Sequence, residues 1–157
     1  VHPRAVRERD EDLAEVRRMI EAGETDIARE ELVWLLKGCR DLLEAHQLLG
    51  ELAVREGDWK LARAHFGFAW KLGLDALPPG GLRGLLPARL PANRPFLLSG
   101  KGLAACLVQL NRADLAREVL TQLLRLDPSD PLGAASLLDQ SQGRWDQENG
   151  PAPSAGS

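Results

Sequence analysis

Residues 45–72 read AHQLLGELAVREGDWKLARAHFGFAWKL, two apolar stretches of helical character joined at Gly57-Asp58. A glycine readily ends one helix and an aspartate caps the next, so the chain is expected to turn here. Gly50 in the first stretch and Ala62 in the second are small, and we expect the two helices to approach closely near them. The stretch therefore predicts an antiparallel helical hairpin.

The pattern of this hairpin recurs on both sides of it. The alanine that corresponds to Ala62 is Ala28 in the copy before it and Ala116 in the copy after it. In the last copy Asn111 replaces the turn glycine, an exchange that is tolerated because asparagine can adopt the left-handed backbone conformation. In the first copy the apolar stripe, which includes Leu13, lies one position along from the expected register, so its turn is predicted to be one residue short. Three related hairpins follow from this pattern.

The interval from the second copy to the third is longer than the interval from the first to the second, and the surplus forms an insert rich in proline and glycine at 77–96. Its leucines alternate with Pro87, Pro91 and Pro95, which favours an extended, stiff strip. Leucine side chains gain free energy when they leave water. We therefore expect the insert to be ordered and packed against its own domain, where it covers or narrows a groove.

The sequence after the third hairpin predicts a cap and a tail. Asp130 and Pro131 suit the N-cap and the first position of a short helix that ends near Leu138 and covers the end of the stack. Beyond this helix Gly, Ser, Pro, Asn and Asp dominate, which is typical of disorder. We assign residues 1–139 to the helical domain and residues 140–157 to a disordered tail.

The chain resembles the tetratricopeptide repeat (TPR) in residue type and interval at Leu49-Gly50, Gly57-Asp58, Trp59, Ala62, Phe66 and Ala69. The resemblance implies an all-α fold, a right-handed superhelical solenoid of three hairpins with a C-terminal capping helix. It also implies a concave groove, walled by the first helix of each hairpin, that binds an extended peptide or a partner helix. Alignment with the family places these groove positions at Glu44, Gln47, Glu51, Arg55, Leu98, Lys101, Ala105 and Gln109.

Spacing supports part of this groove without the resemblance. Gln47, Glu51 and Arg55 follow each other at intervals of four, so they share one face of their helix, which is either a binding wall or a solvated surface. Some family members hold a C-terminal carboxylate with a lysine and an asparagine in the first helix. Leu13 and Arg17 occupy those places, so this clamp is not predicted.

Composition and charge exclude several classes of protein. The 157 residues are 44% hydrophobic and carry a formal charge of −3, with no cluster of basic residues, so neither nucleic acid nor an anionic membrane surface is an expected partner. No apolar stretch reaches the roughly 20 residues of a transmembrane helix. The first residues are followed by charged ones, unlike a signal peptide, and we expect a cytoplasm of bacterial type.

Residues capable of chemistry are present without the arrangement that chemistry needs. Around Gly100-Lys101 neither the earlier glycine nor the following Ser or Thr of a phosphate-binding loop is found. His46 and His65 lie in successive helices without an obvious third metal ligand. We predict no catalytic site, no metal and no cofactor.

The cysteines and tryptophans have structural interpretations. Cys39 and Cys106 are expected as free thiols. Trp59 and Trp70 are expected in the core or between hairpins, and Trp34 is expected to be partly exposed, while Trp145 lies in the predicted tail.

The sequence thus predicts a non-catalytic adaptor or scaffold that binds a protein or peptide. Two alternatives stay open at this point. One is a self-assembling structural or chaperone-like homodimer, and the other is a small-molecule binder or an enzyme built on the same scaffold.

Overall fold

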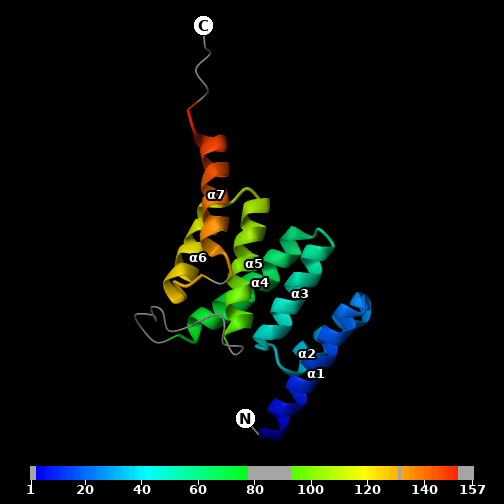
Figure 1. Ribbon diagram of the computed structural model, residues 1–157. Helices are drawn as coiled ribbons and strands as arrows, with labels where there is room; N and C mark the ends of the chain where they lie inside the picture. Colours follow the sequence, from blue (N-terminus) through cyan, green and yellow to red (C-terminus); the bar gives the residue numbers. More distant parts are fainter. Residues whose placement is uncertain (1–2, 78–92, 131, 152–157) are drawn as a thin grey trace.

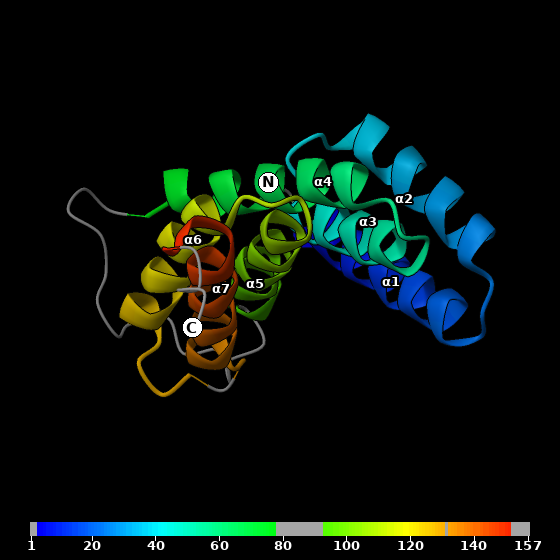
Figure 2. The ribbon, with the colours of Figure 1, turned by 90° about the horizontal axis from the view of Figure 1, so that it is seen from above.

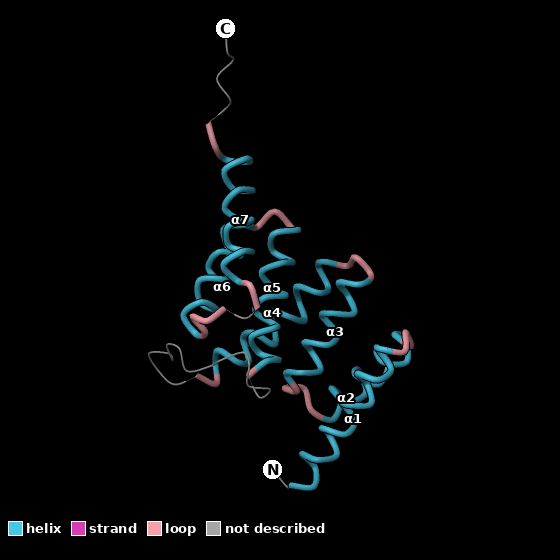
Figure 3. Tube along the Cα trace, in the orientation of Figure 1, coloured by secondary structure: helices cyan, strands magenta, loops and turns pink. Residues whose placement is uncertain are grey.

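The computed structural model describes residues 3–77, 93–130 and 132–151, and within these ranges every regular element is a helix. In chain order the helices are α1 (Pro3–Glu21), α2 (Thr25–Gly38), α3 (Leu43–Arg55), α4 (Trp59–Asp75), α5 (Arg94–Gln109), α6 (Ala113–Leu126) and α7 (Ala134–Asn149). Helices make up most of the trace in Figure 3. Each helix packs against the next, with α1 and α2 on one side, α6 and α7 on the other, and α3 to α5 between them (Figure 1, Figure 2). The all-α class is confirmed over this part of the chain.

Three turns share one backbone geometry. After α1, α3 and α5 the residue with positive φ is Gly23 at +80°, Gly57 at +74° and Asn111 at +60°. In each turn the next amide donates to the carbonyl oxygen five residues back, over distances of 2.9, 2.9 and 2.7 Å. These bonds satisfy carbonyls that a helix end otherwise leaves without a partner. The prediction that Asn111 stands in for a turn glycine is confirmed.

The turn of the first hairpin is as long as the other two, so the predicted shortening is wrong. Residues 22–24 join α1 to α2, just as residues 56–58 and 110–112 join the later pairs. Leu13 and Val16 are buried in α1, as Gln47 and Gly50 are in α3. The interval from each α1 residue to its α3 counterpart equals the interval between the two turn glycines, Gly23 and Gly57, so the two hairpins are in register. Among the described helices α1 packs mainly on α2, so fewer of its positions need apolar side chains. For this reason the apolar stripe of α1 resembles one shifted by one position from the stripe of the second hairpin.

Glycines leave space for an aromatic ring at the centre of the core. A Cβ on Gly50 of α3 would lie 2.7 Å from the ring of Phe66 in α4, and a Cβ on Gly102 of α5 would lie 2.7 Å from other atoms of that ring. Such distances are far shorter than van der Waals contact. The residue that faces Gly50 is therefore Phe66, one helical turn after Ala62, and its ring joins three helices.

A second aromatic pair joins α4 to α5. The rings of Trp70 and Phe96 stack with centroids 4.6 Å apart at 16°, and each ring lies over a glycine of the other helix, Gly100 and Gly73 respectively. Both aromatic side chains are buried, as expected for Trp70. Phe96 is thus a core residue of α5 rather than part of the predicted insert at 77–96, because α5 already begins at Arg94. The expected packing of the rest of the insert, residues 78–92, lies outside the described residues.

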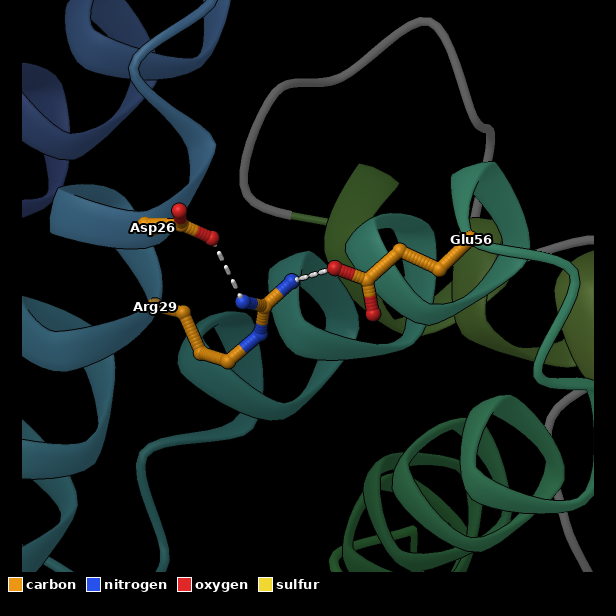
Figure 4. Close-up of polar contacts among 3 residues, drawn as sticks. All are labelled: Asp26, Arg29 and Glu56. Atoms are coloured by element: carbon orange, nitrogen blue, oxygen red, sulfur yellow. Dashed lines mark hydrogen bonds and ion pairs between the residues drawn. The ribbon is translucent and has the colours of Figure 1, made fainter.

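The first hairpin has its own hydrophobic cluster, formed by α1, α2 and α3. An ion-pair network on its surface adds a polar link to α3. Arg29 of α2 lies between Asp26, at 3.2 Å, and Glu56, which follows α3, so that one guanidinium contacts both carboxylates (Figure 4). Exposed ion pairs contribute little free energy individually, so the apolar cluster supplies most of the attachment.

The C-terminal helix differs from its prediction in start and length. Asp130 does cap it, but from further away: its carboxylate accepts bonds from the amides of Ala134 (2.6 Å) and Ala135 (2.9 Å), and the helix begins after Gly133. The helix then continues to Asn149, so the predicted end near Leu138 and the predicted disorder are wrong for residues 140–149.

Tertiary contacts explain why α7 is longer than its composition suggests. Ser141 is fully buried within it. The ring of Trp145, placed in the tail by the sequence, lies 5.0 Å from the guanidinium carbon of Arg117 in α6. A cation over an aromatic face is a favourable contact, and it fastens the second half of α7 to α6.

Candidate functional site

A pocket of about 470 Å³ lies where the first helices of the three hairpins meet. Its volume is within the range of ligand-binding pockets. The described lining comes from α1 (Arg17, Ile20, Glu21), α3 (Glu44, Gln47, Leu48, Glu51, Arg55) and α5 (Arg94, Pro95, Leu98).

The central wall of the pocket is one face of α3. Gln47, Glu51 and Arg55 are one helical turn apart, and all three line the pocket, as their spacing predicts. The amide nitrogen of Gln47 donates to the carboxylate of Glu51 over 2.6 Å. Gln47 is buried and Glu51 is half-buried, so this bond holds the Gln47 amide in place against one oxygen of the Glu51 carboxylate.

An ion pair joins two walls of the pocket. Arg17 of α1 contacts the carboxylate of Glu44 in α3. The Glu44 side chain is only 20% exposed, which shields the pair from solvent more than a fully exposed pair. The contact links α1 to α3 at the pocket, in addition to the apolar cluster that α1, α2 and α3 share.

Arg55 and Arg94 also line the pocket, and neither guanidinium forms an ion pair with a residue in the described part of the chain. Guanidinium groups present several donors in a plane and bind carboxylates or backbone carbonyls well. Ile20, Leu48, Pro95 and Leu98 add apolar surface. Among the described lining residues the titratable groups are the three arginines and the carboxylates of Glu21, Glu44 and Glu51.

Five of the predicted groove residues meet in this pocket: Glu44, Gln47, Glu51, Arg55 and Leu98. Two do not line it. Lys101 is half-buried in α5, and Gln109 is exposed at the last position of that helix. Ala105 is also half-buried and outside the lining. The third hairpin therefore contributes the start of α5 instead of its whole length.

Sequence reasoning missed the contribution of α1. Arg17 and Glu21 line the pocket at the positions of the first hairpin that correspond to Glu51 and Arg55 in the second. The repeat interval alone would have selected them, had the first turn been given its full length. Arg94 was missed because it was assigned to the insert.

The two helical histidines, His46 of α3 and His65 of α4, do meet. Their Nδ1 atoms are 3.4 Å apart, and the Nε2 of His46 lies 3.0 Å from the carbonyl oxygen of Arg40. That Nε2 must therefore donate, so Nδ1 of neutral His46 accepts a hydrogen bond from Nδ1–H of His65. Burial, with a smaller contribution from His46, lowers the pKa of His65. No third His, Cys, Asp or Glu of the described residues completes a metal site with them.

Both cysteines are free thiols. Burial raises the pKa of Cys106 to about 11, although the nearby charge of Arg63 acts in the opposite direction. Cys39 is half-buried at the end of α2 and accepts a long contact of 3.7 Å from Arg9. A thiol with a raised pKa is a poor nucleophile, which suits a packing role for Cys106.

A second surface carries exposed apolar side chains on α2 and α4. Ile27 is 53% exposed and Trp34 63%, so Trp34 is on the surface as expected, and Leu61 and Phe68 are 42% and 40% exposed. Leu61 and Phe68 occupy the positions of the second hairpin that correspond to Ile27 and Trp34 in the first, so the two helices present apolar side chains at equivalent places. Contiguous apolar patches often mark interaction sites, whereas single exposed apolar side chains are common on protein surfaces.

The chain matches no model of a known protein family, and no curated protein matches it. Among the described helices none combines the length and the apolar character that crossing a membrane requires.

Proposed function

We propose that this protein is an interaction module of tetratricopeptide type, in which the pocket between α1, α3 and α5 binds an extended peptide or a helix of a partner protein. One observation carries the proposal: side chains from the first helices of all three hairpins line a single pocket, and five of them are positions that the repeat pattern selects. The three turns of like geometry support a repeat origin for the hairpins. In this proposal the hairpins stack as a right-handed superhelix whose concave side holds the pocket.

The chemistry of the lining defines the partner segment. Arg55 and Arg94 suit a carboxylate or backbone carbonyls, while the carboxylates of Glu21 and Glu51 suit backbone amides or a basic side chain. Leu48 and Leu98 suit an apolar side chain. We propose a segment of mixed charge with at least one apolar anchor, bound without a covalent step. Both described cysteines are free, which suits a reducing cytoplasm.

Peptide selection with the purified chain tests this proposal. Peptides are selected from a displayed library, and their affinities are measured for the wild type and for a variant with Glu51→Lys and Arg55→Glu. We expect at least a tenfold loss in that variant, about 1.4 kcal/mol. The control reverses Arg7 and Glu11, two exposed residues of α1 with the same spacing and outside the pocket. If the pocket variant keeps the helical circular dichroism spectrum of the wild type and binds the peptides with equal affinity, the pocket is excluded as the binding site.

The exposed surface of α2 and α4 favours a second candidate function, a homodimer. We propose that Ile27, Trp34, Leu61 and Phe68 pack against the same surface of a second copy, because burial of four large apolar side chains is favourable. Light scattering over a range of concentrations measures the mass. This function is supported if the chain is a dimer and Trp34→Lys dissociates it. The control is Val6→Lys, at an exposed position on α1, which should leave the dimer intact. A monomer at every concentration rules it out.

A further inference from the structure

A hollow of about 640 Å³ lies between α4 and the turn that joins α5 to α6. Its described lining is Lys60, Arg63, Ala64, Gly67, Leu110 and Arg112. None of these residues lines the pocket between α1, α3 and α5, so the two sites are separate.

All three charged side chains of this hollow are cationic, although the chain as a whole has a formal charge of −3. Arg112 has one ion-pair partner, Asp114, and its two contacts of 3.4 and 3.5 Å are long for hydrogen bonds. Lys60 and Arg63 have no ion pair in the described part of the chain. The lining therefore concentrates positive charge that the described protein only weakly neutralises.

Arg63 is the residue that connects this charge to the interior. Its side chain is half-buried, and its charge acts on the thiol of Cys106, a fully buried residue of α5. A cation that is partly removed from water and lacks a carboxylate partner is unfavourable on its own. An anion in the hollow would remove this cost.

Gly67 gives an independent reason to regard the hollow as a binding site. Glycine inside a helix is less favourable than alanine. At Gly50, Gly73, Gly100 and Gly102 an aromatic ring occupies the space of the missing side chain. At Gly67 a Cβ would meet only Leu103, at an ordinary contact distance of 3.8 Å, so helix packing does not require glycine there. Its effect is to keep the wall of the hollow open, beside the cations.

We propose that this hollow binds the phosphate group of a small phosphorylated metabolite. Lys60, Arg63 and Arg112 surround the phosphate, whose double charge and several acceptor oxygens match three cationic donors better than a single carboxylate does. Ala64, Gly67 and Leu110 contact the organic part. The volume exceeds the need of inorganic phosphate and is typical of a small-molecule site.

Calorimetry on the whole chain at low ionic strength tests the proposal with glycerol 3-phosphate, inorganic phosphate and a phosphoserine peptide as probes. We expect saturable binding of both small phosphates, tighter for glycerol 3-phosphate because its carbon chain adds contacts with Ala64, Gly67 and Leu110 that inorganic phosphate lacks. Arg63→Gln should weaken that binding at least tenfold. Arg7→Gln, which removes the same charge from an exposed position on α1, should change it less than twofold.

A second variant separates binding from folding. Gly67→Ala should raise the melting temperature, since the Cβ has room, and should weaken glycerol 3-phosphate binding severalfold because it narrows the hollow. Absence of saturable binding, equal affinity for Arg63→Gln and wild type, or a stabilised Gly67→Ala with full affinity would overturn the proposal. Binding of the phosphoserine peptide at least tenfold tighter than glycerol 3-phosphate would replace the metabolite with a phosphorylated protein.

Discussion

The ring of Phe66 is confined between two helices, and the substitution Gly50→Ala tests that confinement. The new Cβ would lie 2.7 Å from Cδ1 and Cε1 of the ring and 2.9 Å from Cγ. The ring has no free space on the α5 side, because Gly102 is as close to it there as Gly50 is on the α3 side. Relief of the clash therefore requires a shift of α3 or α5, which is the condition for an overpacking cost of about 1–3 kcal/mol.

Helix propensity acts in the opposite direction on this variant. Alanine is more favourable than glycine inside a helix by about 1 kcal/mol. With an overpacking cost of about 2 kcal/mol, the net free energy of unfolding falls by about 1 kcal/mol. Gly67→Ala has the same propensity gain without the clash and should be more stable than wild type by up to about 1 kcal/mol. The two variants should thus differ by about 2 kcal/mol, or about 4–8 °C in melting temperature for a chain of this size.

Urea unfolding followed by circular dichroism measures these differences. A double-mutant cycle with Phe66→Leu identifies their origin, since the smaller side chain removes the clash. In that background Gly50→Ala should be neutral or stabilising. If Gly50→Ala is as stable as Gly67→Ala in the wild-type background, the ring is not confined and the account of this core is incorrect.

Three further predictions concern single residues. The lowered pKa of His65 means that the unfolded chain takes up a proton before the folded one does as pH falls, so stability should decrease from about pH 6.5, the ordinary histidine value, down to the pKa of the folded state. The urea midpoint measured at pH 7.5 and 5.5 should show this loss, and His65→Gln should lose less over the same interval. Ala62→Leu, at a fully buried position, should reduce the free energy of unfolding by about 1–3 kcal/mol, and an unchanged melting temperature would contradict its tight packing. At pH 8 a thiol reagent should modify Cys39 in the folded protein and Cys106 only after unfolding, because Cys106 is buried with a pKa of about 11; rapid loss of both thiols would show that the core opens easily.

The amino-acid sequence determined the local features of this protein. Gly57 and Asn111 end helices at a left-handed residue because the backbone conformation depends mainly on the residue itself. The recurrence of the small residue at Ala28, Ala62 and Ala116 gives the three hairpins, since each alanine lies in a helix that follows such a turn. The shared face of α3 that lines the pocket also follows from helical spacing alone.

The tertiary structure decided which of these local features meet. Gly50 faces Phe66, and Gly100 faces Trp70. Which residues of two packed helices face each other depends on how far one helix is offset along the other, and side chains of both helices set that offset. The same offset brings Arg17 and Arg94 into the pocket and leaves Lys101 and Gln109 outside its lining.

Helix length at the C-terminus was decided in the same way. The composition of residues 140–149 favours disorder, yet burial of Ser141 and the contact of Trp145 with Arg117 supply interactions that local propensity lacks. The free energy of packing outweighs weak helix propensity once another helix, here α6, provides a surface to pack on. The residue pattern of α7 by itself does not indicate that this surface exists.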